Sequence, residues 1–139
     1  MSAENEVHKA SDQFYAALNR LFNGNADFME EIWSHNPSVS ALHAIGGRVM
    51  GWDNVRESYQ DVAQIAEEGQ VKLEDQMIQV IGDCAYEVGV ERGQATFAGY
   101  QVALDYRVTN IYHCEAGLWK IVHRHTDTSQ AMLDGLNQT

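Results

Sequence analysis

Two histidines near the end of the chain, His123 and His125, are the clearest candidates for catalytic side chains in the sequence. In the segment "WKIVHRHTD", residues 119–127, His123 and His125 share the phase of Trp119 and Ile121. Residues two apart in a strand point to the same face, so the pattern predicts two imidazoles on the apolar side of a strand. An imidazole in such a place can act as a general base, because its pKa lies near neutrality.

A long strand before this segment supplies a partner for the histidines. In "YQVALDYRVTNIYHC", residues 100–114, the even positions are apolar or aromatic except for Asn110. If Ala116 and Gly117 form a two-residue hairpin turn, facing residues share one side of the sheet. The predicted pairs are then Asn110 with His123, Val108 with His125, and Tyr112 with Ile121. A register slip by one residue would exchange the two sides of the strand.

These pairs define a candidate catalytic group of His123, Asn110 and His43. His123 would be the base, Asn110 would orient it or polarise a carbonyl, and His43, before a Gly-Gly bend, would sit at the pocket mouth. The alternative is structural. In that case His123 and Asn110 form an internal hydrogen bond that keeps two polar groups paired, and His43 simply packs.

Aromatic and apolar side chains from several elements are predicted to line the same pocket. The tyrosines could donate hydrogen bonds to a ligand, although an aromatic side chain at helix or strand spacing also fits an ordinary core. Trp52, at a helix entrance, is either a pocket lid or a packing residue. The predicted ligand-binding residues are Tyr15, Trp52, Tyr59, Tyr86, Val88, Tyr106, Val108, Tyr112 and His125.

Metal binding is the other chemistry that the two histidines permit. One strand can present two imidazoles to a metal at the spacing of His123 and His125, with a third ligand from His43 or Asp127. No stronger metal motif accompanies the pair. We therefore predict no metal site and no cofactor.

Composition limits the classes of partner. The chain has 139 residues without a composition break, which predicts one domain over residues 1–139. With 9 basic against 20 acidic side chains, the formal charge of −11 argues against nucleic acid and membranes as partners. No apolar run can span a bilayer and the acidic start lacks the basic region of a secretory signal, so we expect a cytoplasmic protein. Cys84 and Cys114 lack CxxC spacing and are predicted to be small buried thiols.

Hydrophobic periodicity predicts three helices followed by a meander of strands. The helices are expected in residues 3–25, 26–37 and 54–69, and the longer strands in residues 71–81, 84–95, 100–114 and 118–127. Asp53 would cap the third helix, and two short strands flank the Gly-Gly bend before it. Glu87 and Glu91 lie on the side of their strand opposite Tyr86 and Val88, so no carboxylate is expected in the pocket. Helices over one face of a curved sheet give an α+β fold with a hollow.

The stretches "HAIGGRVMGWDNVRESY" and "RVTNIYHCEAGLWKIVHRHTD" resemble the nuclear transport factor 2-like superfamily, specifically its SnoaL-like branch. They are similar to the association domain of calcium/calmodulin-dependent protein kinase II and to ketosteroid isomerase-like folds. The resemblance implies a cone-shaped, cystatin-like fold with three N-terminal helices on a curved, mostly antiparallel sheet. It also implies one of two kinds of function, either that of a cofactor-independent isomerase, dehydratase or cyclase, or that of a noncatalytic oligomerisation module. Tyr15 could stand for the tyrosine of the isomerases, whereas Asn110 replaces a basic pocket residue of the kinase domain.

The sequence therefore predicts a homodimer with an apolar pocket for a small, neutral or weakly polar molecule. If the protein is an enzyme, His123 would be the base of an isomerase, dehydratase or cyclase. The alternative is a noncatalytic module that binds a ligand or a protein, which the missing inward carboxylates favour. The residues predicted to face outward and to form the dimer surface are Arg107, Ile111, Lys120, Val122 and Arg124.

Overall fold

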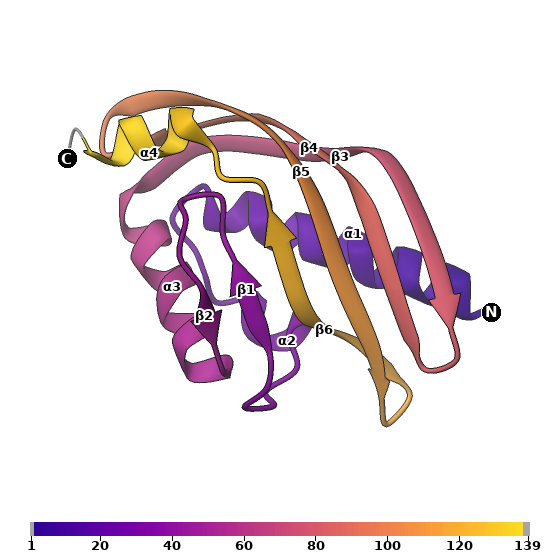
Figure 1. Ribbon diagram of the computed structural model, residues 1–139. Helices are drawn as coiled ribbons and strands as arrows, with labels where there is room; N and C mark the ends of the chain where they lie inside the picture. The colour runs from indigo at the N-terminus through magenta and orange to yellow at the C-terminus, as the bar shows by residue number, and fades with distance from the viewer. Residues whose placement is uncertain (1, 138–139) are drawn as a thin grey trace.

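The computed structural model describes residues 2–137, which form an α+β fold with one curved sheet (Figure 1). The elements are α1 (Ala3–Leu21), α2 (Met29–Ile32), β1 (Ser40–Leu42), β2 (Val49–Met50), α3 (Trp52–Ile65), β3 (Ala66–Ile81), β4 (Cys84–Phe97), β5 (Tyr100–Glu115), β6 (Leu118–Thr126) and α4 (Gln130–Asn137). The predicted fold class is confirmed. The sequence did not predict α4, which packs against β5.

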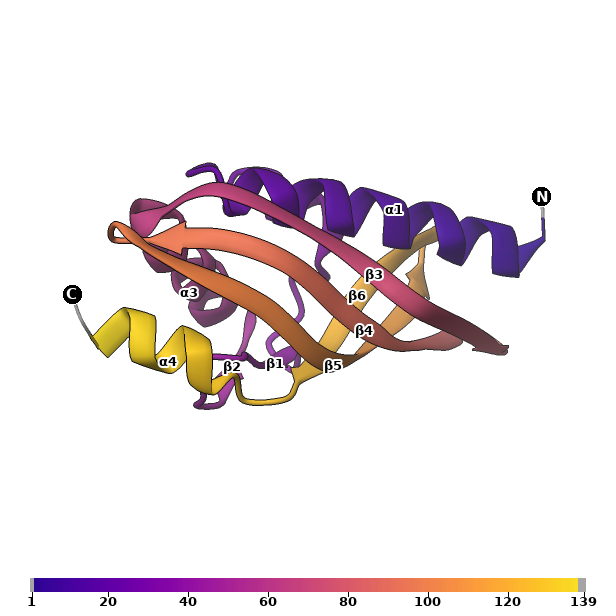
Figure 2. The same ribbon diagram turned by 90° about the horizontal axis from the view of Figure 1, so that it is seen from above.

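The sheet has the strand order β2-β1-β6-β5-β4-β3. The four long strands β3 to β6 form the expected antiparallel meander, while β1 joins the edge of β6 in parallel. Figure 2 shows α1 lying along the sheet on its concave side, with α3 and α4 near one end. The core lies between α1 and the inner face of the sheet.

Helix α1 begins where the sequence predicts, because its start and its buried stripe are both well specified, but it ends at Leu21 and not at the predicted residue 25. The side chain of Ser2 accepts a hydrogen bond from the backbone N–H of Asn5, and two glutamates favour the positive end of the helix dipole. Its buried residues recur at helical spacing and face the core; they include Val7, Phe14, Leu18 and Leu21. Within residues 2–137, no helix has the length and apolarity needed to cross a bilayer.

Helix α3 differs from the prediction at both ends. Gly51, with a φ of 82°, takes the N-cap position in place of Asp53, which lies inside the first turn. The helix ends at Ile65 because strand β3 begins at Ala66. Cys84 also departs from the prediction, since it is exposed at the start of β4.

Two glycines in β4 allow the sheet to bend. The pairing of β3 with β4 shifts register between Glu67 and Gln70 and again between Glu74 and Met77, the second close to the phase change that the sequence indicates. Gly93 lies beside the first shift and Gly89 beside the second. A Cβ atom on Gly93 would lie 1.8 Å from the backbone oxygen of Gln70, and one on Gly89 would lie 2.8 Å from that of Glu74. Glycine therefore permits the close approach of the strands that curves the sheet.

A further register shift, in β6, reverses the predicted orientation of the histidines. Tyr112 pairs with Ile121 as predicted, but the shift next to this pair leaves Val122 as an extra residue in β6. The pairs beyond it are Ile111 with His123, Asn110 with Arg124, and Thr109 with His125. The predicted pairing of Asn110 with His123 and of Val108 with His125 is therefore wrong. One inserted residue moves every later side chain of β6 to the opposite face, so Arg124 points inward.

Replacing Gly93 by alanine should destabilise the fold, because the new methyl group would meet the main chain of β3. We expect the free energy of unfolding in urea to fall by about 1–3 kcal/mol or more. The neighbouring exposed residue provides the control, and Gln94→Ala should change this free energy by less than about 0.5 kcal/mol. Equal stability of Gly93→Ala and the wild type would contradict the close packing of β3 on β4.

Candidate functional site

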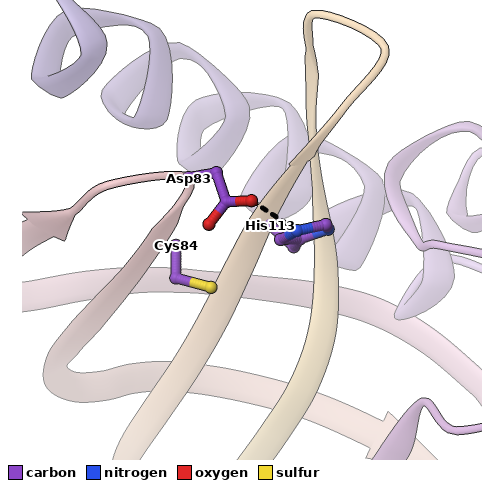
Figure 3. Close-up of side chains that lie close together, drawn as sticks. All are labelled: Asp83, Cys84 and His113. Atoms are coloured by element: carbon purple, nitrogen blue, oxygen red, sulfur yellow. Dashed lines mark hydrogen bonds and ion pairs between the residues drawn. The ribbon is translucent and has the colours of Figure 1, made fainter.

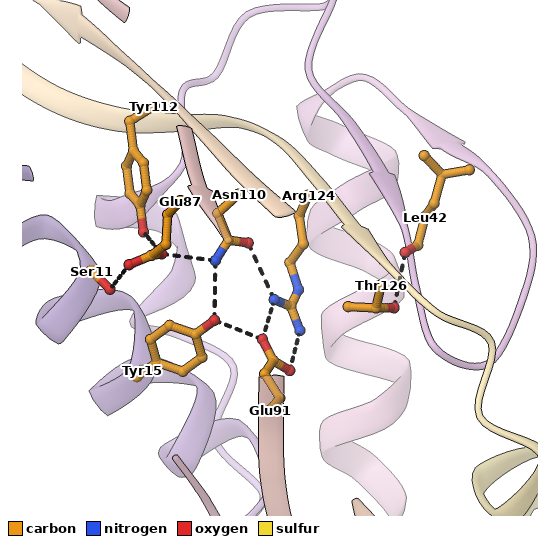
Figure 4. Close-up of polar contacts among 9 residues, drawn as sticks. All are labelled: Ser11, Tyr15, Leu42, Glu87, Glu91, Asn110, Tyr112, Arg124 and Thr126. Carbon is orange, nitrogen blue, oxygen red and sulfur yellow. Dashed lines mark hydrogen bonds and ion pairs between the residues drawn. The ribbon is translucent and has the colours of Figure 1, made fainter. Parts of the chain in front are cut away.

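The inner face of the sheet holds a cluster of polar side chains in the middle of β4, β5 and β6 (Figure 4). Glu87, Glu91 and Asn110 have exposed fractions of 0%, and Arg124 has 4%. Burying charged groups is costly unless each one is paired or fully hydrogen-bonded. The contacts within the cluster must therefore compensate for lost hydration.

Arg124 and Glu91 form a bidentate ion pair. Arg124 Nη2 donates to Glu91 Oε1 at 2.8 Å, and Arg124 Nη1 donates to Glu91 Oε2 and to Asn110 Oδ1. Burial alone would lower the pKa of the Arg124 guanidinium, but the adjacent Glu91 carboxylate outweighs it and the pKa lies well above its ordinary value. The guanidinium also lies 5.0 Å from the centre of the Phe14 ring. Arg124 is therefore a fixed positive charge inside the fold.

Glu87 has no cation among its hydrogen-bond partners and is held by neutral donors. Its Oε1 accepts from Asn110 Nδ2 at 3.0 Å and from the Tyr112 hydroxyl at 2.8 Å. Its Oε2 accepts from the Ser11 hydroxyl and from Gln76 Nε2 at 2.7 Å. Each carboxylate oxygen accepts up to two hydrogen bonds, so these four donors fill the capacity of Glu87.

Asn110 and Tyr15 connect the two carboxylates into one network. Asn110 Nδ2 donates to the Tyr15 hydroxyl at 3.1 Å as well as to Glu87, and the Tyr15 hydroxyl donates to Glu91 Oε2 at 2.8 Å. Burial, with a contribution from Glu91, raises the pKa of Tyr15 well above its ordinary value, so the phenol keeps its proton. The network therefore has fixed donor and acceptor roles from α1 to β6.

A small cavity lies beside the Arg124 end of this network. Its polar walls come from the loop after β1 and from α3, β5 and β6, while α1 and α4 contribute apolar side chains. Its volume is about 40 Å³, which is space for only a few water molecules. The lining residues that matter for chemistry are His43, Ser58, Tyr59, Tyr106, Arg124 and Met132.

His43 is a neutral imidazole in this cavity, and its hydrogen bonds identify the tautomer. The Ser58 hydroxyl donates its proton to the backbone oxygen of Val55 at 2.6 Å, so His43 Nε2, 3.0 Å from Ser58 Oγ, must be the donor to that oxygen. Burial, reinforced by Arg124, lowers the pKa of His43 from 6.5 to about 4. The lone pair of Nδ1 remains, without a hydrogen-bond partner among the described residues. This nitrogen can accept a proton.

Two donors at the cavity wall have no partner within the described part of the chain. They are the hydroxyl of Tyr59 and Nε of Arg124, both buried. Burial raises the pKa of Tyr59 to about 12, although nearby Arg124 lowers it, so the hydroxyl stays protonated. An unpaired buried donor costs about 1–3 kcal/mol. Such donors at a cavity wall are positioned to hold an acceptor atom of a ligand.

Of the predicted site residues, three lie at the cavity and three in the network. His43, Tyr59 and Tyr106 line the cavity. The residues in the network are Tyr15, Asn110 and Tyr112. The structure thus brings together residues from both predicted sets, the catalytic one and the ligand-binding one.

The predicted placement of His123 and His125 in the pocket is wrong. His125 is exposed, and His123 is half-buried with its Nδ1 bonded to Ser40 Oγ at 2.6 Å. Partial burial, with His125 nearby, lowers the pKa of His123. Both rings lie on the outer face because of the extra residue in β6.

Four other predicted lining residues also lie away from the cavity. Tyr86 and Val88 are half-buried on the outer face of β4, since Glu87 between them points inward. Val108 is buried and lines a separate open groove with Val88 and His125, not this cavity. Trp52 is stacked on His35, with ring centres 4.7 Å apart. It is a packing residue, not a lid.

The sequence reasoning missed Glu87, Glu91 and Arg124. It assigned the apolar phase of β4 to the inside, yet the opposite phase carries Gly89 and Gly93 along with the glutamates. Small residues in that phase signal crowding by α1 and β3 and could have identified the inner face. The prediction that Arg124 faces outward is also wrong. The cause is the same extra residue in β6 that turns the two histidines to the outer face.

A family model for the SnoaL-like domain matches residues 7–129 of the chain. The protein belongs to the SnoaL-like domain family. This match confirms the resemblance to the SnoaL-like branch from which the fold was predicted. A comparison with curated proteins found no match.

Solved structures confirm the nuclear transport factor 2-like fold of this SnoaL-like domain. A proposed dehydratase of the nuclear transport factor 2-like family from Streptomyces avermitilis is 22% identical with a TM-score of 0.78, over 91% of this chain and 96% of that one. A superfamily protein from Salmonella enterica is 17% identical with a TM-score of 0.79, over 91% of each chain. The calcium/calmodulin-dependent protein kinase II hub of S. rosetta is 19% identical with a TM-score of 0.74, over 93% of this chain and 98% of that one. At these identities the likeness establishes the fold alone.

His43 should make the stability of the protein depend on pH in a defined window. Its pKa in the fold, about 4, is below its value of 6.5 in the unfolded chain, so the unfolded state binds the proton more readily. The contribution of neutral His43 is therefore complete above pH 6.5 and is lost as the pH falls toward 4. In His43→Gln, the free energy of unfolding should fall less between these pH values than in the wild type.

The control for this measurement is His8→Gln, which changes a histidine on the exposed side of α1. It should follow the wild-type dependence on pH. Identical slopes for the wild type and His43→Gln would show that His43 is not held neutral by the fold. Urea unfolding at several pH values provides the comparison.

Proposed function

We propose that the protein binds a small organic molecule with a carbonyl group in the cavity under α4. The observation that carries this proposal is the pair of buried donors without partners, Tyr59 Oη and Arg124 Nε, at the wall of that cavity. A ligand oxygen that accepts from them would recover the free energy lost by burying them unpaired. The remaining lining is mainly apolar, which suits an uncharged or weakly polar ligand.

Proton transfer beside that carbonyl is the reaction that these groups favour. His43 Nδ1 would take a proton from the carbon next to the carbonyl, and the electron pair of the broken C–H bond would move to the oxygen as an enolate. Tyr59 and Arg124 would stabilise the negative charge there. Isomerisation, dehydration and aldol-type cyclisation can all begin with this step. His43 thus takes the role of base that the sequence suggested for His123.

Ligand entry would require movement at α4. The cavity of about 40 Å³ is too small for an organic substrate, and the buried side chain of Met132 forms part of its wall. Methionine is unbranched and adapts readily to a neighbouring molecule. Displacement of Met132, with or without α4, would enlarge the cavity on the side where β5 and α4 meet.

A noncatalytic module that binds and oligomerises is the second candidate. Glu87 and Glu91 are already occupied by hydrogen bonds, so neither carboxylate is free to act as a base. The outer face of the sheet carries half-buried apolar side chains, including Tyr86 and Ile111, which suit pairing with a second copy of the chain. The hub among the structural neighbours is consistent with this role. We propose a homodimer through this face for either function.

The test begins with native mass spectrometry of small molecules that copurify with the protein, together with a panel of small cyclic and aromatic ketones. For a ligand that binds, Tyr59→Phe should weaken the affinity about tenfold, because one buried hydrogen bond is lost. Tyr86→Phe, on the outer face, should bind as the wild type does. His43→Gln should bind within a few-fold but should convert the ligand at least about a hundredfold more slowly.

The outcomes separate the two candidates. A wild-type protein that binds the ligand, never converts it, and has at least the mass of a dimer in light scattering would be the module. A ligand whose affinity is unchanged in Tyr59→Phe would place binding outside the cavity and contradict the proposal.

A further inference from the structure

A second cluster of chemically reactive side chains lies outside the inner network, at the turn between β3 and β4 (Figure 3). Asp83 lies in the turn, Cys84 is the first residue of β4, and His113 comes from β5. The thiol, the carboxylate and the imidazole offer one ligand atom each, and these atoms lie within 4.8 Å of one another. The cluster plays no part in the cavity or the network described above.

The backbone fixes the relative positions of the three side chains. Cys84 and His113 face each other across the ladder of β4 and β5, so their side chains share one side of the sheet. The backbone N–H of Cys114 donates to the backbone oxygen of Asp83 at 2.8 Å, which ties the turn to β5. Gly82, with a φ of 62°, lets the chain turn sharply before Asp83.

The two ring nitrogens of His113 have different neighbours. Nε2 faces Asp83, 3.1 Å from its Oδ2, and Nδ1 faces Glu115, 3.6 Å from its Oε2. Metal-binding histidines commonly direct one nitrogen to the metal and the other to a carboxylate that orients the ring. Glu115 is placed to orient the His113 ring in this way, so the cluster contains an orienting carboxylate in addition to its three ligands.

Stability does not explain this cluster. The side chains of Asp83 and His113 are 72% and 37% exposed, and an exposed ion pair contributes little to folding. Cys84 is exposed and free, so it does not pack as an ordinary core thiol does. A ligand that all three groups share accounts for their convergence.

We propose that Asp83, Cys84 and His113 form a binding site for Zn²⁺. Thiolate, imidazole and carboxylate are the ligand types that zinc takes, and in a tetrahedral site their atoms would be about 3.4–3.6 Å apart. The contraction from 4.8 Å would come from side-chain rotation of Asp83 and Cys84, both of which are exposed. Zinc replaces the thiol proton, which leaves to solvent, and the fourth position takes water.

The site was not predicted from the sequence because its ligands are separated along the chain by β4 and most of β5. Asp83 and Cys84 are adjacent, and His113 comes from the next strand but reaches them through the ladder. The sequence instead drew attention to His123 and His125, whose ring centres lie 6.3 Å apart on β6. That pair provides an internal competitor for zinc and hence a matched control.

The experiment is a calorimetric titration of the full chain with zinc chloride in the presence of a phosphine reductant that keeps the thiols reduced. The wild type should bind one Zn²⁺ per chain. Cys84→Ser and His113→Gln should each weaken binding at least about tenfold, and Glu115→Gln about tenfold through loss of ring orientation. Cys114→Ser and His125→Gln should bind within about twofold of the wild type.

Cobalt substitution and unfolding curves complete the test. Co²⁺ should give a thiolate-to-cobalt charge-transfer band in the wild type and in Cys114→Ser, but not in Cys84→Ser. Urea unfolding of the metal-free variants should show the wild-type midpoint, because the replaced side chains are at the surface. Absence of zinc binding in the wild type, unchanged affinity in Cys84→Ser, or an equal loss in His125→Gln would overturn the proposal.

Discussion

The buried ion pair between Arg124 and Glu91 is the interaction on which the inner face of this SnoaL-like domain depends. Both charges are buried, so each must find its compensation largely within the protein. The guanidinium binds Glu91 with two nitrogens and also reaches Asn110. Asn110 in turn bonds Tyr15 and Glu87, which couples β4, β5 and β6 to α1. The pair therefore fixes which side of each strand is inside.

The network and the cavity on the inner face differ in how fully their polar groups are hydrogen-bonded. In the network, Glu87 has its hydrogen-bonding capacity filled, which makes it a rigid support and not a reactive group. At the cavity, donors of Tyr59 and Arg124 remain unpaired, and His43 keeps an available lone pair. Arg124 belongs to both regions, because its Nη atoms hold the network while its side chain also lines the cavity. The hydrogen-bonded network therefore supports the cavity lining from behind and holds the Arg124 side chain in place.

The sequence revealed the architecture better than the site. The existence and start of the first helix, the hairpin at Ala116 and Gly117 and the inward phase of β5 followed from periodicity and turn chemistry, which act locally. The orientation of His123 did not, because it depends on one extra residue at Val122. Side-chain direction in a strand alternates, so a single bulge exchanges the faces of all later residues. The prediction that the apolar side of β4 faces inward was wrong for a related reason. Glu87 and Glu91 lie inside because Asn110 on β5 and Arg124 on β6 form hydrogen bonds with them.

The most direct measurement of this account is a double-mutant cycle of Glu91→Gln and Arg124→Met, followed by urea unfolding. If the two side chains form a buried pair, Arg124→Met should cost about 3–5 kcal/mol, since it leaves Glu91 buried without its cation. The double variant should then be more stable than the sum of the single losses predicts, by at least about 1 kcal/mol. A coupling free energy indistinguishable from zero would mean that Arg124 points out of the fold, and the arrangement of the inner face would be wrong.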